Sequence, residues 1–135
     1  MAEAYRRVYE QLRAEWDAEV SRLYNLGHSP LPAQSEVLGA VNELSAPRDV
    51  VVCAAGSMPG DLHKLWRTRD AKGYHVEYGY STMGYEIAGG LGVRLADPSR
   101  EVYVMVGDGS YLMMAQEIVT SIQEHAKLTI VLVDN

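Results

Sequence analysis

The sequence predicts an α/β domain with three layers, in which a parallel sheet carries helices on both faces. Short, β-branched apolar runs at residues 49–55, 101–106 and 128–133 alternate with longer segments of helical periodicity. Each run is apolar at consecutive positions, as in strands that are buried on both faces of a parallel sheet. Strands that alternate with helices pair in parallel through right-handed crossovers.

The N-terminal segment is predicted to be a separate helix. Apolar residues recur at spacings of three and four from Ala2 to about Tyr24, which places them on one face. Gly27 and the prolines of residues 29–32 end the helix, because proline lacks the N–H group that a helix interior needs. We therefore divide the chain into an N-terminal helix and linker, residues 1–30, and a main domain, residues 31–135.

The main domain is predicted to begin with a helix from Ala33 to Leu44. Its inward-facing residues are expected to be Val37, Val41 and Leu44. The strand at residues 49–55 follows, and then a loop from Gly56 to Gly60. Asp61 is expected to cap a short helix that ends at Trp66.

A polar, exposed segment at residues 67–73 leads into a short strand at residues 75–78 and a helix from Met83 to Leu95. The apolar side of this helix is expected to carry Met83, Ile87, Leu91 and Leu95. The helix also contains four glycines, at positions 84, 89, 90 and 92. Each interior glycine costs roughly 0.5–1 kcal/mol relative to alanine, so we expect a neighbouring backbone or a ligand to lie close.

The segment Gly107–Ser110 (GDGS) follows the strand at residues 101–106. Asp-Gly pairs are common in tight turns, and a plain turn is the simplest interpretation. A helical pattern follows instead of a second hairpin strand, however, with its apolar residues at Ala115, Ile118, Val119, Ile122 and Ala126.

A helix that begins near Gly109 and Ser110 would favour a bound phosphate at its N-terminus. A Mg²⁺ ion between this phosphate and Asp108 would remove their repulsion. Asn135 follows the last strand and offers an amide oxygen at the adjacent strand end. The residues therefore predict a diphosphate that is held through Mg²⁺ at the carboxyl edge of the sheet.

Composition and charge restrict the function classes. The formal net charge is −6, which argues against contact with a nucleic-acid backbone, because that contact needs a basic face. The single cysteine, Cys53, stands in an apolar run, where we expect a buried structural thiol. No apolar run is long enough to cross a membrane, and the N-terminus does not resemble a signal peptide. We expect a cytoplasmic protein with no nucleic-acid or membrane partner.

The GDGS segment and the Asn-containing end of the last strand resemble the cofactor signature of thiamine-diphosphate enzymes. The resemblance implies that thiamine diphosphate and Mg²⁺ are bound, with Asp108 and Asn135 as the metal ligands. It assigns contacts with the diphosphate to Gly107, Asp108, Gly109 and Ser110. Asp134 stands where the family has the first asparagine of a pair, a departure outside the metal-binding position.

Two further segments carry the same resemblance. Residues 80–84 (YSTMG) resemble the segment in which a bulky apolar residue, here Met83, wedges the cofactor into a bent conformation. In this segment the backbone carbonyl of Ser81 would accept a hydrogen bond from the aminopyrimidine. Gly56 and Ser57 resemble the loop that contacts the diphosphate from the first strand. Apart from the family, Met83 is equally well a core methionine, and Gly56-Ser57 a plain turn between strand and helix.

The strings AAGSMPGDLHKLWRT, EYGYSTMGYEIAGGLGV and EVYVMVGDGSYLMM resemble a subfamily of hydrolases that open the ring of a cyclic diketone. The resemblance covers about Leu31 to Asn135. It implies hydrolysis of trihydroxycyclohexane-1,2-dione to 5-deoxyglucuronate in inositol catabolism. A carboligase or decarboxylase similar to acetolactate synthase is one alternative, and a noncatalytic phosphate-binding module is another.

The family's catalytic glutamate, which activates the aminopyrimidine, belongs to a separate pyrimidine-binding domain of the same full-length protein or of a second subunit. No part of this chain resembles that domain, so no catalytic residue is assigned here. We expect a fragment whose domain is incomplete at the C-terminus, inactive by itself and prone to form homo-oligomers. His63 and His75 lie near the proposed cleft and are candidate contacts for the diketone.

Overall fold

The computed structural model describes residues 2–134 and contains one parallel sheet. Its strands are β1 (Val50–Cys53), β2 (Tyr74–Val76), β3 (Val102–Gly107) and β4 (Thr129–Val133). They are arranged in the order β2-β1-β3-β4, and every neighbouring pair is parallel. The predicted parallel α/β sheet is therefore confirmed.

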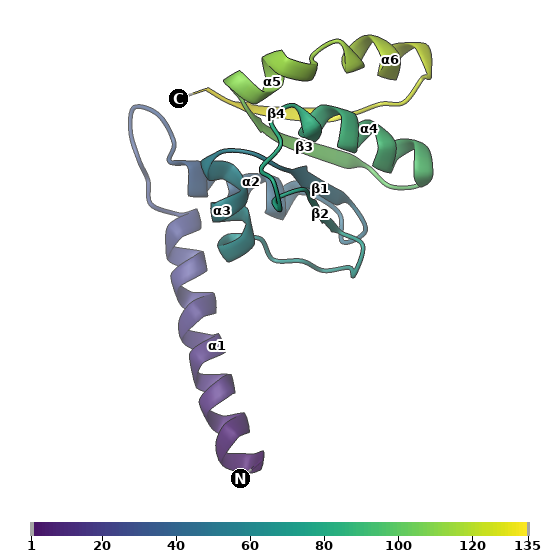
Figure 1. Ribbon diagram of the computed structural model, residues 1–135. Coiled ribbons are helices and arrows are strands. Elements are labelled where there is room, and N and C mark those ends of the chain that lie inside the picture. The colour runs from purple at the N-terminus through teal and green to yellow at the C-terminus, as the bar shows by residue number, and fades with distance from the viewer. Residues whose placement is uncertain (1, 135) are drawn as a thin grey trace.

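Helices cover both faces of this sheet, as Figure 1 shows. One face carries α1 (Ala2–Tyr24), α2 (Gln34–Leu44) and α3 (Ser57–Leu65), and the other carries α4 (Tyr85–Ala96), α5 (Asp108–Met114) and α6 (Glu117–Gln123). Side chains of β1 alternate between the two layers, because successive residues of a strand point to opposite faces. Val51 and Cys53 pack against the first layer, and Val50 and Val52 against the second.

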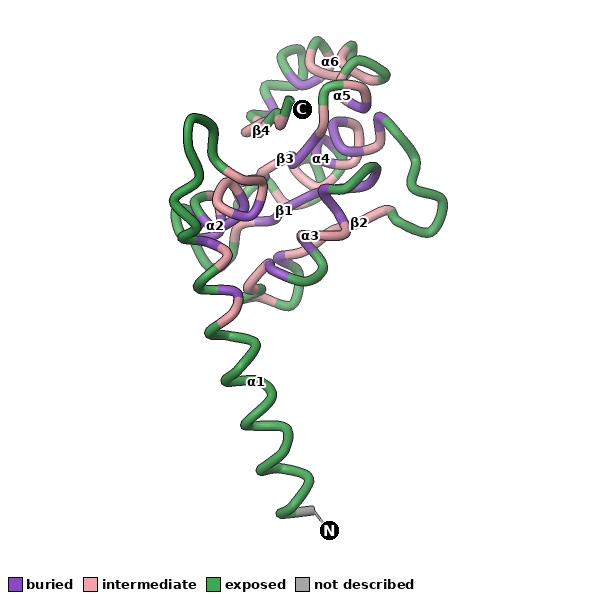
Figure 2. Tube along the Cα trace, turned by 90° about the vertical axis from the view of Figure 1, so that its left-hand side faces the viewer, coloured by how far each residue is buried: buried purple, intermediate pink, exposed green. Residues whose placement is uncertain are grey.

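Helix α1 extends away from the rest of the chain, and only its C-terminal end is buried (Figure 2). Val20 and Tyr24 are 2 % and 6 % exposed and belong to the core under the sheet. The earlier members of the same apolar stripe, including Leu12 and Trp16, are exposed. The Trp16 indole is the first to reach the domain, where its Nε1 donates to the carbonyl of Lys64 at 3.2 Å.

Helix α2 is confirmed, but its inward face is rotated from the predicted one. Leu38 is fully buried, whereas Leu44, predicted to face inward, is 83 % exposed. Val37 and Val41 are partly buried against the core, as expected. The buried polar residue Asn42 lies on this face because its amide donates to the carbonyl of Arg67 at 3.2 Å, a contact that the apolar pattern could not reveal.

The predicted loop at Gly56–Gly60 is wrong, because α3 already begins at Ser57. Pro59 is compatible with this helix because it stands in the first turn, where its missing N–H would have had no helical partner. Asp61 is not the cap. Its carboxylate instead accepts a hydrogen bond from the Gln34 side chain at 2.6 Å, which ties α3 to α2.

Helix α4 begins two residues later than predicted, so Met83 lies outside it. Ile87 and Leu91 are buried as expected, but Leu95 is half exposed. Gly90 has a clear packing reason, since a Cβ atom there would overlap the side chain of Val104 on β3. The close neighbour of Gly90 is thus a side chain of the sheet, not a backbone or a ligand.

The segment after β3 forms two helices where the apolar pattern predicted one. Asp108 opens α5 directly, so the helix after GDGS is confirmed, but Ala115 and Gln116 separate α5 from α6. The break resets the helical phase and turns Ser121 inward, while Val119 and Ile122 are 57 % and 67 % exposed. Their predicted place on the buried face is therefore wrong.

Cys53 is fully buried in β1, and its Sγ lies 3.6 Å from the hydroxyl of Tyr74. Burial raises the pKa of this thiol to about 11, so roughly 0.1 % of it is thiolate at pH 8. We expect the native chain to react with a thiol reagent at pH 8 far more slowly than the urea-unfolded chain, as measured by release of the chromophore. Equal rates would show that β1 opens readily.

The helices in the described part of the chain offer no segment with the length and apolarity of a membrane span.

Candidate functional site

A cavity of about 230 Å³ opens at the carboxyl edge of the sheet, beyond the ends of β1 and β3. Three parts of the chain form most of its wall: the turn after β1, the GDGS segment after β3, and Met83 before α4. Gln34 at the start of α2 and Val133 at the end of β4 complete the wall. In open α/β sheets this edge is where ligands bind.

The structure brings most of the predicted cofactor contacts to this one cavity. Those that line it are Gly56, Ser57, Met83, Gly107, Asp108, Gly109 and Ser110. Ser81 does not line it, although it stands two residues from Met83. Asn135, the second predicted metal ligand, lies outside the described residues. Asp134, next to it, is exposed.

Two helices point their N-termini at the cavity. Ser57 is the first residue of α3 and Asp108 the first of α5. The first turn of a helix leaves backbone N–H groups without helical acceptors, and the helix dipole adds partial positive charge there. Gly56 precedes α3 with a φ of +84°, a conformation that suits glycine and turns the chain sharply into the helix. The arrangement suits an anion with several oxygen atoms.

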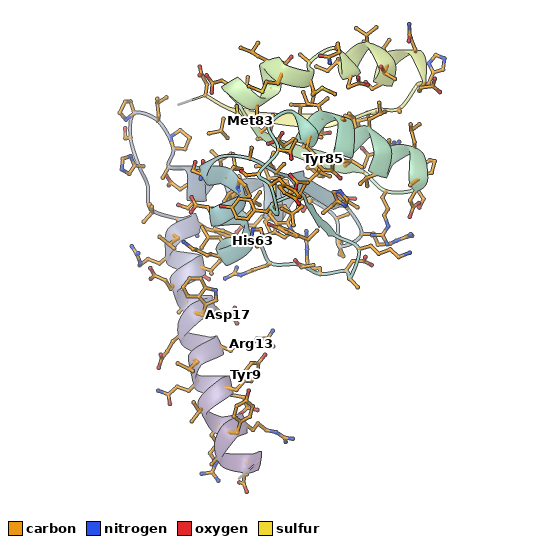
Figure 3. All side chains as sticks on the ribbon, in the orientation of Figure 1. Tyr9, Arg13, Asp17, His63, Met83 and Tyr85 are labelled. Atoms are coloured by element: carbon orange, nitrogen blue, oxygen red, sulfur yellow. The ribbon has the colours of Figure 1, made fainter. Side chains whose placement is uncertain are left out.

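Met83 faces the GDGS segment across the cavity. A Cβ atom built on Gly109 would lie 3.4 Å from the Met83 methyl carbon, so the two residues are near neighbours. Figure 3 shows Met83 in the chain just before α4, beside the beginning of α5. Its side chain is 44 % exposed, so the alternative of a core methionine does not hold.

The loop that carries Met83 is shaped by a carboxylate. Glu77 accepts hydrogen bonds from the N–H groups of Tyr80 and Thr82, at 3.1 and 2.8 Å. These bonds, with that of Thr82 the strongest, hold the pKa of Glu77 below its usual value. Between the two donors, Ser81 takes a left-handed conformation with a φ of +52°. The loop conformation is therefore fixed by contacts made before α4 begins.

Glu86 is a buried polar residue that the sequence reasoning did not single out. It lies in the first turn of α4 with no exposed surface. Its Oε1 accepts from the N–H of Ala55 at 2.9 Å, and its Oε2 accepts from the hydroxyl of Ser110 at 2.6 Å. The Ser110 oxygen also accepts from the N–H of Gly84 at 2.7 Å. One signal was available: Glu86 is a charged residue among small and apolar ones at a helix start.

The part of the cavity wall formed by the described residues carries no basic side chain. Among the described residues that line it, the only ionisable side chain is the carboxylate of Asp108, which is exposed. The described residues also contain no cluster of three His, Cys, Asp or Glu side chains that could hold a metal ion by themselves. A phosphate bound here would need a cation to offset Asp108, and Mg²⁺ is suited to this because it takes one or two side-chain ligands and completes its shell with phosphate and water.

The two candidate histidines lie away from the cavity wall. His63, on α3, places its Nδ1 2.5 Å from the carbonyl of Pro59 and 3.1 Å from the hydroxyl of Tyr74. His75, on β2, places its Nε2 2.7 Å from the hydroxyl of Tyr85 and stacks on that ring. Neither lines the cavity.

Comparison with known proteins gives two findings. Residues 54–135 match the family described as thiamine pyrophosphate enzyme, C-terminal TPP binding domain. This matched range contains every residue named in the cavity wall except Gln34.

Several curated relatives carry the name 3D-(3,5/4)-trihydroxycyclohexane-1,2-dione hydrolase. That of Bacillus thuringiensis (strain Al Hakam) is 46 % identical over 145 residues, covering 89 % of this chain and 22 % of the relative. That of Geobacillus thermodenitrificans is 58 % identical over 102 residues, covering 76 % of this chain and 16 % of the relative. That of Halalkalibacterium halodurans is 46 % identical over 129 residues, covering 96 % of this chain and 20 % of the relative. The chain spans about a fifth of the length of these relatives.

Proposed function

Because this chain belongs to the thiamine pyrophosphate enzyme family and contains its C-terminal TPP binding domain, we propose that the cavity holds the diphosphate of thiamine diphosphate through Mg²⁺. The observation that carries the proposal is the convergence of Gly56, Ser57, Met83 and the GDGS segment on one cavity at the carboxyl edge of the sheet. The backbone N–H groups at the starts of α3 and α5 would bind the diphosphate oxygens.

Asp108 is the proposed protein ligand of the Mg²⁺ ion, and Asn135 the second one. The carboxylate of Asp108 is exposed at the cavity edge, where a cation would lie between it and the diphosphate. The lack of a basic side chain in the described wall supports this arrangement, since two anionic groups would otherwise repel each other.

Met83 is the proposed apolar support for the cofactor's ring system, and the carbonyl of Ser81 the acceptor for its aminopyrimidine. The partial exposure of Met83 on the cavity side supports this role. The fixed conformation around Ser81, held by Glu77, would keep both groups in place before the cofactor arrives.

For the reaction, we propose hydrolytic opening of the trihydroxycyclohexane-1,2-dione ring to 5-deoxyglucuronate. The names of the relatives, which are hydrolases of this diketone, support the proposal. The residues of the cavity wall would hold thiamine diphosphate, which would supply carbanion chemistry when bound. The chain's own residues would orient the cofactor, and the Mg²⁺ ion held by Asp108 would offset the charge of its diphosphate. The glutamate that activates the aminopyrimidine would come from a pyrimidine-binding domain, in the same full-length protein or in a partner subunit.

Exposed apolar side chains support association of this domain with such a partner or with another copy. They lie on α5, α6 and β4, at Leu112, Met113, Val119, Ile122 and Leu132. Apolar surface of this kind is typical of regions that another element covers.

The cofactor proposal is tested by NMR titration of the chain with thiamine diphosphate. With Mg²⁺ present, we expect saturable shifts of the backbone amides of residues 56–58, 83–84 and 107–111. A chelator should abolish them, and thiamine without the diphosphate should produce none. Shifts that persist in the chelator, or that fall elsewhere on the sheet, would contradict the proposal.

The reaction is tested separately, by supplying the diketone or pyruvate to the chain combined with a pyrimidine-binding domain. Formation of 5-deoxyglucuronate supports the hydrolase, whereas formation of acetolactate would identify a carboligase. The chain alone should give neither product.

A further inference from the structure

Three segments that surround the cavity meet at one buried side chain. The turn after β1 contributes the N–H of Ala55, the Met83 loop contributes the N–H of Gly84, and the GDGS segment contributes the hydroxyl of Ser110. Glu86 accepts from Ala55 and Ser110, and the Ser110 oxygen in turn accepts from the N–H of Gly84. The segments are far apart in the sequence, so no local backbone geometry fixes their separation.

The direction of these hydrogen bonds is set by the donors. The N–H of Gly84 can only donate, so the Ser110 oxygen is its acceptor. A serine hydroxyl has a single proton, and that of Ser110 is directed to Glu86. No hydroxyl proton therefore remains for a diphosphate oxygen, and Ser110 is left with its backbone N–H as the donor to a ligand.

We propose that Glu86 is a positioning residue of the cofactor site, which holds the turn after β1, the Met83 loop and the GDGS segment at the separation that the diphosphate requires. The proposal rests on the proposed function, because these are the segments assigned to the cofactor. Glu86 itself does not line the cavity, so it acts through the residues that it binds.

A carboxylate is suited to this place because it accepts from two donors at once. Glutamine has the same shape but only one acceptor oxygen, so its amide N–H₂ group would face either Ala55 N–H or Ser110. Aspartate carries the same two oxygens, but its side chain is one methylene shorter, so they would lie farther from the two donors. Burying a carboxylate without a basic partner is costly, and among the described residues Glu86 takes part in no salt bridge. Its two carboxylate oxygens instead accept hydrogen bonds from the N–H of Ala55 and the hydroxyl of Ser110.

The test uses amide hydrogen exchange of the full chain, followed by NMR. In Glu86→Gln, we expect the amide of Ala55 to exchange about tenfold faster or more, as on loss of a hydrogen bond to a charged group. The amide of Gly84 should also exchange faster, because its acceptor Ser110 is no longer held by the carboxylate. In Ser110→Ala, we expect the amide of Gly84 to accelerate while that of Ala55 keeps its rate. This difference follows from the serial order of the bonds and does not arise from a general loss of stability.

Asn42→Ala serves as the matched control. Asn42 is 5 % exposed and donates a partly buried hydrogen bond to the carbonyl of Arg67, and it does not line the cavity. Loss of this hydrogen bond should accelerate amide exchange, but no more at Ala55 and Gly84 than elsewhere in the domain. The proposal is overturned if Glu86→Gln accelerates these two amides no more than Asn42→Ala does. If Glu86→Gln does not fold, Ser110→Ala decides: acceleration at Ala55 as well as Gly84 would overturn the serial arrangement.

Affinity for thiamine diphosphate with Mg²⁺ is measured on the same variants. We expect it to fall about tenfold in Glu86→Gln and to be unchanged in Asn42→Ala. If Glu86→Gln accelerated exchange at Ala55 and Gly84 but left the affinity for thiamine diphosphate unchanged, the positioning role would be overturned. If the unmodified chain binds no cofactor, the proposed function fails, and the exchange pattern alone decides whether Glu86 joins the three segments.

Discussion

Replacing Asp108 with asparagine should abolish saturable, Mg²⁺-dependent binding of thiamine diphosphate. Among the described residues of the cavity wall, Asp108 has the only ionisable side chain. The substitution therefore removes the one negative charge that these residues offer to a cation. Substitution of residues that merely support metal ligands already costs about 10–100-fold in affinity, and loss of a charged ligand should cost about 100-fold or more. NMR titration with increasing Mg²⁺ measures the change.

Glu117→Gln is the matched control for this variant. Glu117 lies in the first turn of α6 as Asp108 lies in the first turn of α5, and it does not line the cavity. Both substitutions remove one negative charge from a helix N-terminus, which costs about 0.3–1 kcal/mol of stability by the dipole effect. Only Asp108→Asn should weaken binding. An equal loss in both variants would mean that net charge, not coordination, governs affinity.

Gly90→Ala should destabilise the domain by about 2 kcal/mol, as expected for overpacking a core. The new methyl group would overlap the side chain of Val104, which is fully buried in the middle of β3. Alanine is the better helix former by roughly 0.5–1 kcal/mol, and this gain offsets only part of the strain. The free energy of unfolding is measured by urea denaturation with labelling of Cys53 as the probe.

Gly92→Ala separates the packing effect from helix propensity. Gly92 lies in the same helix, but a Cβ atom there would meet nothing within 4 Å. We expect this variant to be stabilised by up to about 1 kcal/mol. If both variants were stabilised, α4 would have to lie farther from β3 than the structure shows.

Periodicity predicted the sheet well because buried parallel strands are apolar at consecutive positions. It failed where a single feature overrides the pattern. The segment predicted as a loop, Gly56–Gly60, forms the start of α3, and the break at Ala115 and Gln116 changes which side of α6 faces the sheet. The sequence of a single segment predicts neither the rotation of α2 toward Leu38 nor the break between α5 and α6. Both depend on which other elements pack against these helices.

The resemblance to a cofactor signature located most of the cavity wall, because glycines and Asp108 mark where the backbone must stay accessible. Gln34 was missed, since its place at the wall depends on α2 lying beside α3, and nothing in the sequence around it indicates this contact. Glu86 was missed for a different reason. Its partners are the backbone N–H of Ala55 and the hydroxyl of Ser110, and such contacts between distant segments leave little trace in a single sequence.

The extended shape of α1 bears on how the chain unfolds. The helix bonds to the domain from Trp16 onward, and residues 3–18 are exposed along their length. An isolated helix of about 12–15 residues is marginally stable in water, so the outer turns of α1 do not share the cooperativity of the sheet. Unfolding is therefore not a single two-state transition: circular dichroism averages α1 with the domain, whereas a probe at β1 reports the domain alone.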